Sequence, residues 1–253
     1  MIEFRGLRKA FGGTVVLDGV DLVIPDRATT VILGASGSGK SVLLKHVVGL
    51  LEPDGGEVVV DGQVVHELDH AGLRELRQRI GFVFQFAALF DSLTVEENLR
   101  LALDRRGLGE EEVAGRVAES LALVELPGTN DRYPAELSGG MRKRVGIARA
   151  ISLRPEYILY DEPTSGLDPV TTATMDDLIL RARETLGVTG VVVSHDLRSA
   201  FRIADRLVML HEGRVRQAGT VAELQASGDP VVRQFIEGRR APAAAPSAPG
   251  GSA

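Results

Sequence analysis

The chain has 253 residues, 44% of them hydrophobic and 25% charged, which is the composition of an ordinary globular protein. A net charge of −6 argues against a broad basic face, so we expect no nucleic-acid partner. The absence of cysteine excludes disulfides and thiolate metal sites. The first residues lack the pattern of a signal peptide, and no apolar run approaches the ~18 residues of a membrane span. Any role at a membrane therefore requires a partner.

Alternating apolar and polar residues predict strands over 1–7 and 15–24, joined by the Gly12-Gly13 turn. A short apolar strand over 29–33 runs into a glycine-rich loop, and a helix is predicted over 41–51. The remaining predicted strands are 57–65 with a turn at Asp61-Gly62, 80–84, 157–160, 190–194, 206–210 and 214–218.

Between residues 94 and 152 the apolar residues take a helical period, and helices are also predicted over 170–186 and 197–204. Strands that alternate with helices predict an α/β fold with a mostly parallel core sheet. We expect a main domain over 1–228, with an inserted helical subdomain at about 86–155. A C-terminal extension over 229–240 and a disordered Ala/Pro/Gly/Ser tail over 241–253 are expected to follow.

Residues 34–41 read Gly-Ala-Ser-Gly-Ser-Gly-Lys-Ser and match the pattern of a phosphate-binding loop. Its glycines let backbone N–H groups point at phosphate oxygens, and the next helix directs its positive end at the same anion. Lys40 can reach the β- and γ-phosphates, and Ser41 can ligate Mg²⁺. A Gly/Ser-rich surface turn is the alternative, but the strand before the loop and the helix after it favour phosphate binding. The expected nucleotide contacts are Gly34, Ser36, Gly37, Ser38, Gly39, Lys40, Ser41 and Val42.

Two acids, Asp161 and Glu162, end an apolar strand. Adjacent strand residues point to opposite sides, so one carboxylate can serve Mg²⁺ while the other faces a different group. We assign the metal to Asp161 and the activation of an attacking water to Glu162. Alone, the pair would more often be a solvated helix cap. The phosphate loop in the same chain favours catalysis.

The string Leu137-Ser138-Gly139-Gly140-Met141 precedes a helix predicted over 142–153 and leaves its first N–H groups free for a second anion. A capped helix after a turn is the ordinary alternative. The string resembles the signature motif of ABC transporter ATP-binding subunits. Gln85 resembles the Q-loop glutamine of that family, and Ser165-Gly166-Leu167-Asp168 resembles its D-loop, with Asp168 as the nucleotide contact. His195 resembles the H-loop histidine and Phe11 the aromatic that stacks on adenine.

This resemblance spans about residues 4–219 and implies a P-loop ABC ATPase fold with an antiparallel β subdomain. It also implies ATP and Mg²⁺ as ligands and ATP hydrolysis coupled to transport. Catalytic roles fall on Glu162, His195, Lys40 and Gln85, and metal contacts on Ser41, Gln85 and Asp161. The nucleotide contacts that it adds are Phe11, Gln85, Ser138, Gly139, Gly140, Asp168 and His195.

In the family, two copies meet head to tail, with ATP between the phosphate loop of one copy and the signature helix of the other. The resemblance therefore implies a homodimer bound to an integral-membrane permease. It places the chain in the cytoplasm, peripheral on the inner face of the cell membrane.

Met141 stands where the usual signature has glutamine, and it cannot donate a hydrogen bond to a ribose. Met141, residues 84–95 and residues 229–238 resemble the Mla/Mce branch of bacterial lipid transporters. That branch implies phospholipid transport, an MCE-domain lipid-binding partner and, in some systems, a STAS-domain subunit. Its C-terminal extension can embrace the neighbouring ATPase, and Val232, Phe235 and Ile236 are the expected apolar anchors.

Other functions remain open from the residues alone. An ATPase of an amino-acid or other small-solute importer would use the same catalytic parts. A soluble ABC ATPase acting on DNA or the ribosome would need a longer insertion between Lys40 and Asp161, and a small-molecule kinase has no use for residues 137–141. Phe86, Leu89 and Phe90 fit either the core of the helical subdomain or a groove for the permease.

Overall fold

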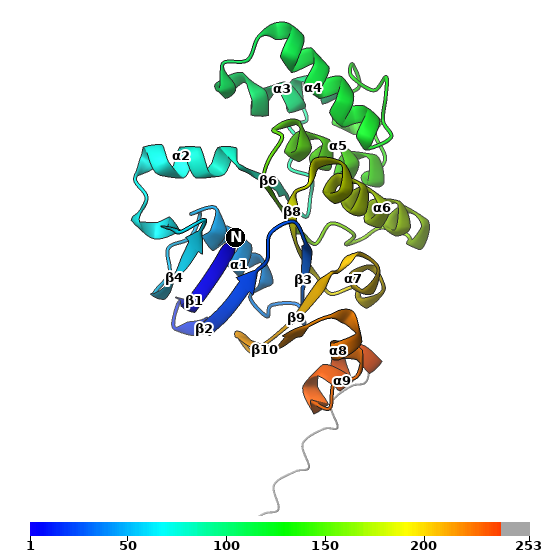
Figure 1. The fold of residues 1–253 in the computed structure, drawn as a ribbon. Helices are drawn as coiled ribbons and strands as arrows, with labels where there is room; N and C mark the ends of the chain where they lie inside the picture. The colour runs from blue at the N-terminus through cyan, green and yellow to red at the C-terminus, as the bar shows by residue number, and fades with distance from the viewer. Residues whose placement is uncertain (239–253) are drawn as a thin grey trace, which may run out of the picture.

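The computed structural model describes residues 1–238, which form two sheets with helices around them (Figure 1). The larger sheet has the order β10-β9-β3-β8-β7-β6, and its strands run parallel except for β10, which pairs antiparallel with β9. Its strands are β3 (Thr29–Leu33), β6 (Ile80–Val83), β7 (Tyr157–Asp161), β8 (Thr189–Ser194), β9 (Arg206–His211) and β10 (Arg214–Gly219). This sheet confirms the predicted α/β class.

The second sheet is antiparallel and has the order β2-β1-β4-β5. Its strands are β1 (Ile2–Phe11), β2 (Thr14–Ile24), β4 (Gly55–Val60) and β5 (Gln63–Val64). The hairpins turn at Gly12-Gly13 and at Asp61-Gly62, as the turn residues predict. The helices are α1 (Lys40–Val47), α2 (His70–Gln78), α3 (Val95–Leu103), α4 (Glu110–Leu123), α5 (Gly139–Ser152), α6 (Pro169–Leu186), α7 (Leu197–Ile203), α8 (Val221–Gln225) and α9 (Pro230–Glu237).

Strand β3 separates two buried clusters because its side chains alternate between the two faces of the sheet. Val31 and Leu33 belong to the cluster that includes residues of α5 and α6. Ile32 belongs to the cluster that includes α1 and the antiparallel sheet. A strand buried on both faces reads as a continuous apolar run, which is why residues 29–33 are predictable.

The three helices α3, α4 and α5 lie between β6 and β7 in the chain and together at the top of the molecule in Figure 1. Thr94 begins α3 with a capping box in which its side chain accepts from the Glu97 N–H. The buried Asn98 donates to the carbonyls of Phe90, Leu93 and Thr94, which fixes the segment before α3. The predicted subdomain bounds of 86–155 enclose these helices.

Two features differ from the sequence expectation, and a third prediction falls on residues that the structure does not describe. Helix α1 ends at Val47 and not at residue 51, because Gly49 takes a φ of +61°. Helix α2 was not predicted; it begins at the cap Asp69, whose carboxylate accepts from the Gly72 N–H at 2.8 Å. The predicted disordered tail, residues 241–253, lies outside the described residues.

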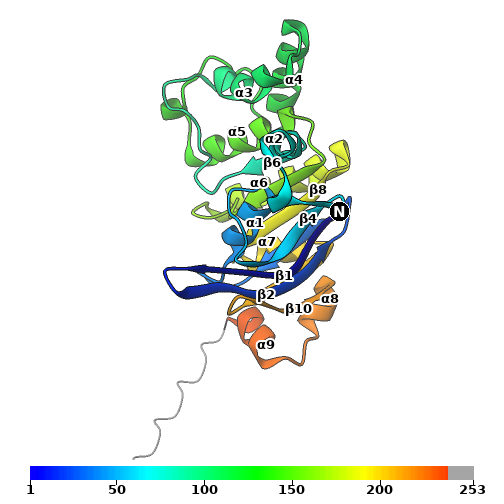
Figure 2. The same ribbon diagram turned by 90° about the vertical axis from the view of Figure 1, so that its left-hand side faces the viewer.

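The C-terminal extension forms α9, at the opposite end of the molecule from α3 and α4 (Figure 2). Its cap Asp229 pairs with Arg216 of β10 at 2.7 Å. Val232 is 1% exposed within the chain's own core, and Phe235 and Ile236 pack partly against that core. The expectation that Val232 serves as an anchor for a neighbouring copy is therefore wrong for this conformation, because its own chain covers it.

We expect Gly56→Ala to destabilise the protein, because Gly56 has a φ of +70° and a Cβ there would clash with the carbonyl oxygens of Arg5 and Gly6. Left-handed strain and the clash together should lower the free energy of unfolding by about 3 kcal/mol. The matched control is Gly62→Ala, where φ is +82° and a Cβ meets no atom within 4 Å. It should cost only about 1 kcal/mol. Equal losses for both variants in urea unfolding would contradict the close approach of β1 and β4.

Candidate nucleotide site

The glycine-rich loop over 34–39 joins β3 to α1 and is held between β2 and β9. A Cβ at Gly34 would lie 2.5 Å from the Leu210 carbonyl oxygen of β9. Gly39 has a φ of +99°, and a Cβ there would lie 2.7 Å from Leu17 Cδ2 of β2. Both positions therefore need glycine for space, and Gly39 also needs it for its backbone conformation.

The ammonium of Lys40 points back into the loop, and the residue is 6% exposed. It donates to the carbonyls of Gly34 at 2.8 Å and Ala35 at 3.1 Å, and it lies 3.5 Å from Glu162 Oε1. Burial lowers the pKa of Lys40 below its ordinary value, although Glu162 opposes this shift. An anionic phosphate at the loop would stabilise the charged ammonium further.

Ser41 and Asp161 meet at the start of α1, where the Ser41 hydroxyl donates to Asp161 Oδ1 at 2.6 Å. Hydroxyl and carboxylate oxygens are the ligand types that Mg²⁺ takes when phosphates fill the rest of its shell. The buried Ser38 hydroxyl, directly before Gly39, has no hydrogen-bond partner among the described residues. An unpaired buried hydroxyl inside the loop is consistent with a polar ligand there.

Glu162 follows β7 and takes a φ of +51°, which is uncommon for a residue with a side chain. The Nδ1–H of His195, just after β8, donates to Glu162 Oε2 at 2.8 Å. Glu162 therefore lies between Lys40 and His195, whereas its neighbour Asp161 contacts Ser41. The separate partners of the two carboxylates agree with the alternation predicted from the strand.

Gln85 follows β6 in a turn that contains two left-handed alanines, Ala87 at φ +59° and Ala88 at φ +47°. Arg149 of α5 donates to both of their carbonyls, at 2.9 Å and 2.6 Å. Burial lowers the pKa of Arg149, because it removes water from the charged guanidinium. The two carbonyls replace part of that water as hydrogen-bond acceptors. The turn is thus strained locally and stabilised from α5.

These elements enclose a cleft of about 410 Å³. It is lined by Val16, Ser36, Gly37, Gly39, Lys40, Ser41, Val42, Gln85, Glu162, Ser165 and His195. Val16 and Ser165 were not predicted. Val16 lines the cleft because β2 packs beside the glycine-rich loop, and this contact between distant parts of the chain leaves no local sequence pattern. Ser165 lies in the string 165–168, from which only Asp168 was predicted to contact nucleotide.

The remaining predicted residues lie outside the cleft of a single chain. Ser138 caps α5 by accepting from the Met141 N–H at 3.2 Å, with Gly139 and Gly140 in the first turn. Asp168 caps α6, and Phe11 is 44% exposed at the end of β1. The signature residues of one chain therefore do not complete the phosphate site of the same chain.

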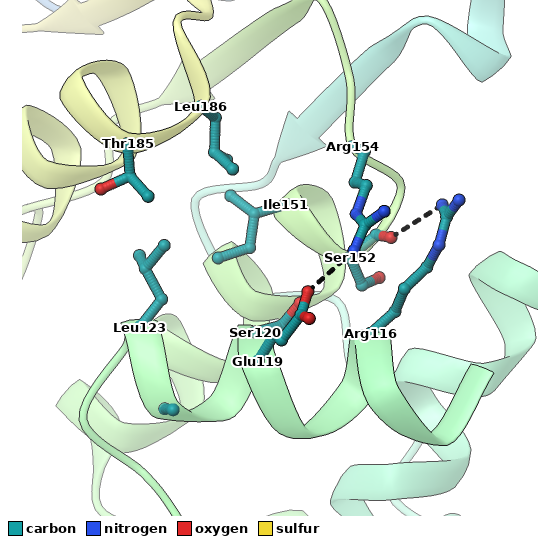
Figure 3. Close-up of a pocket in the computed structure, with 10 residues that line it drawn as sticks. Arg116, Glu119, Ser120, Leu123, Ile151, Ser152, Arg154, Thr185 and Leu186 are labelled. Carbon is teal, nitrogen blue, oxygen red and sulfur yellow. Dashed lines mark hydrogen bonds and ion pairs between the residues drawn. The ribbon is translucent and has the colours of Figure 1, made fainter. Parts of the chain in front are cut away.

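A second cleft, of about 370 Å³, lies between α4 and the ends of α5 and α6 (Figure 3). Leu123, Ile151 and Leu186 give it an apolar lining, and Arg154 pairs with Glu119 at 2.9 Å on its edge. None of the residues predicted to bind nucleotide lines this cleft. The cleft at the glycine-rich loop therefore remains the candidate nucleotide site.

Comparison with known proteins finds relatives among transport ATP-binding proteins. A family model described as ABC transporter matches residues 17–165. The probable ribonucleotide transport ATP-binding protein mkl of Mycobacterium bovis is 42% identical over 240 residues, covering 94% of this chain and 67% of the relative. The chloroplastic protein trigalactosyldiacylglycerol 3 of Arabidopsis thaliana is 39% identical, with coverages of 94% and 74%. The methionine import ATP-binding protein MetN 3 of Pseudomonas fluorescens is 43% identical, with coverages of 88% and 70%.

The fold also matches solved cassettes. A dimeric structure of the ATP-binding cassette MJ0796 in a post-hydrolysis state, bound to ADP and Pi, has a TM-score of 0.80 and 35% sequence identity. The match covers 87% of this chain and 99% of that one. Among the described residues, no helix is both long and apolar enough to cross a membrane.

We expect Glu162→Gln to retain ATP binding and to slow hydrolysis by roughly 10²–10⁴-fold, because an amide cannot accept the proton of the attacking water. Single-turnover hydrolysis and nucleotide binding, measured separately, check this. The control is Glu212→Gln, an exposed glutamate in the turn between β9 and β10. Turnover by Glu162→Gln within a factor of two of the wild type would contradict the general-base assignment.

Ala88→Gly should stabilise the protein by about 0.5–1 kcal/mol, because glycine accepts the left-handed conformation with less strain than alanine. Ala118→Gly is the matched control at an exposed position within α4, and it should destabilise by about 1 kcal/mol. Thermal or urea unfolding gives both values. The same sign for the two variants would contradict the strain at Ala88.

Proposed function

The chain belongs to the ABC transporter family as an ATP-binding subunit that hydrolyses ATP, and on that basis we propose that it powers phospholipid transport through a partner permease of the Mla/Mce type. The observation that carries this proposal is the segment over 84–95 together with Met141, which resemble that branch. A relative named after a glycolipid, trigalactosyldiacylglycerol 3, supports it.

The segment over 84–95 has a surface suited to an apolar partner. Phe86 is 86% exposed and Phe90 58% exposed, whereas Leu89 packs against the core. Leu89 therefore fits the interpretation as core of the helical subdomain, whereas Phe86 and Phe90 fit the interpretation as a docking surface for the permease. Phenylalanines exposed beside the Gln85 turn favour docking of a permease helix near the nucleotide cleft.

In the proposed reaction, Lys40 and the loop N–H groups bind the β- and γ-phosphates of ATP. Glu162 orients a water and accepts its proton as the oxygen attacks the γ-phosphorus, which releases ADP and phosphate. His195 Nδ1, 2.8 Å from Glu162 Oε2, would hold this carboxylate in position. Ser41, Asp161 and Gln85 would hold Mg²⁺, which neutralises phosphate charge.

We assign the active form to a head-to-tail homodimer. The free N–H groups at the start of α5, with Ser138, Gly139 and Gly140, would complete the γ-phosphate site of the other copy. Phe11 would stack on the adenine, and Asp168 would lie at the junction of the copies. The similar cassette MJ0796, solved as a dimer with ADP and Pi, supports this assignment.

The proposed assembly contains the homodimer, an integral-membrane permease, an MCE-domain lipid-binding protein and, in systems that have one, a STAS-domain subunit. The ATPase would be peripheral on the inner face of the cell membrane, in the cytoplasm. No nucleic-acid partner is proposed.

The methionine import relative, at 43% identity, favours a second candidate: an ATPase of an amino-acid importer. Both candidates share the catalytic cleft, so only the partner discriminates between them. The test is purification of the chain with its permease from membranes, followed by ATPase measurement in phospholipid nanodiscs. Stimulation by an MCE-domain protein and bound phospholipid would support lipid transport. Stimulation by a methionine-loaded binding protein alone would replace it with amino-acid import.

Ser138→Arg mixed with wild-type protein tests the trans site, because the arginine would block the partner's γ-phosphate position. The variant also carries Glu162→Gln, so only wild-type phosphate loops turn over; at a threefold excess of this variant, we expect turnover per wild-type subunit to fall to about one quarter, the fraction of partners that remain wild type. Gln63→Arg in the same Glu162→Gln background, exposed in the hairpin between β4 and β5, should leave turnover per wild-type subunit unchanged as the control. Unaffected turnover in both mixtures would reject completion by a partner.

A further inference from the structure

Lys143 lies in the second turn of α5, where it contacts the loop that carries the catalytic carboxylate. Its ammonium donates to the carbonyl of Pro163 at 3.1 Å and to that of Ser165 at 2.5 Å. Pro163 directly follows Glu162, and Ser165 lines the nucleotide cleft. The signature helix and the catalytic loop of one chain are thus joined through a single side chain.

This ammonium does not owe its position to a salt bridge. Both of its hydrogen bonds go to backbone carbonyls, and no carboxylate forms an ion pair with it within residues 1–238. Burial lowers the pKa of Lys143, and only the charge of Glu162 acts against that shift. Charge-assisted hydrogen bonds to two carbonyls hold those carbonyls in place, so the contacts of Lys143 point to a role in the loop.

At its start the loop is held by the Glu162 N–H, which donates to the Val193 carbonyl at 3.0 Å, and by the contacts of the Glu162 carboxylate with Lys40 and His195. Glu162 begins it in a left-handed conformation, and two short turns follow, with the Ser165 N–H donating to the Glu162 carbonyl at 3.2 Å and the Leu167 N–H to the Thr164 carbonyl at 3.2 Å. Lys143 satisfies two of the loop's carbonyls from outside. Removal of its ammonium would free these carbonyls and loosen the backbone on which Glu162 depends.

The start of α5 and Lys143 are connected by a continuous helix. Ser138 caps the helix, and Lys143 lies five residues later, about 7–8 Å along the axis at the rise of an α-helix. Gly140 packs against α6, since a Cβ there would lie 2.6 Å from Thr171 Cγ2. The signature end and Lys143 therefore lie on one continuous helix that packs against α6, so ordering of the first turn would also order the turn that carries Lys143.

We propose that Lys143 is a positioning residue that couples the signature end of α5 to Glu162 of the same chain. Nucleotide bound by the partner's phosphate loop contacts Ser138 and orders α5. Lys143 then holds the loop of residues 162–165 in the geometry for hydrolysis. Each copy thus senses the occupancy of the other copy's cleft. This inference rests on the proposed head-to-tail pairing.

The coupling predicts cooperative hydrolysis in the purified full-length chain. The dependence of the ATPase rate on ATP concentration should give a Hill coefficient of about 1.5–2 for the wild type, near the limit set by two sites. Lys143→Met should lower it to about 1 and reduce kcat roughly tenfold, with ATP binding to the isolated chain unchanged. Lys143→Gln keeps a hydrogen-bond donor and should recover part of both values. Lys45→Met, at an exposed lysine of α1, is the matched control.

A second measurement separates this inference from the pairing on which it rests. ATP-dependent dimerisation is measured by light scattering for Glu162→Gln and for Glu162→Gln with Lys143→Met, and both should form dimers. Failure of Glu162→Gln alone to dimerise would reject the pairing itself. If both dimerise, an unchanged Hill coefficient in Lys143→Met, whatever its kcat, would overturn the coupling role. Should Lys143→Met fail to fold, an unchanged Hill coefficient in Lys143→Gln would overturn it equally.

Discussion

The buried ammonium of Lys40 is the charge around which the cleft is arranged. It is held by the carbonyls of its own loop and lies beside Glu162, and its burial disfavours the charged form. A single cation thus connects the glycine-rich loop to Glu162, the proposed catalytic carboxylate. A terminal phosphate would add the strong anionic partner that the carbonyls do not supply, so binding and catalysis draw on the same electrostatic constraint.

The parallel sheet makes this arrangement possible. Strands β3, β8 and β7 are neighbours, and their carboxyl ends meet at one edge. That edge carries the phosphate loop after β3, His195 after β8 and Glu162 after β7. Three segments far apart in sequence therefore converge without a long loop, as ligand sites in open α/β sheets commonly do. Helix α5 then contacts the site from outside, through Lys143 on one side and Arg149 on the other.

The sequence predicts the parts of the fold in which local pattern and burial agree. Strand β3 was predicted with its observed bounds, because each of its residues is buried and apolar or threonine. Helix α2 was missed because five of its nine residues are charged or histidine or glutamine, with few apolar positions to show a period. Val16 and the burial of Val232 depend on contacts between distant elements, which no local pattern records. Residues with a motif were found, whereas those placed only by packing were not.

At Glu162 the left-handed backbone lowers the stability of the fold, while the side chain that it presents is needed for the proposed hydrolysis. The substitution that would relax this backbone best is glycine, which removes the very carboxylate that the conformation presents. A library selected only for heat resistance would therefore enrich an inactive protein at this site. Selection for a more thermostable variant must therefore keep glutamate at position 162 and find stabilising substitutions at other positions.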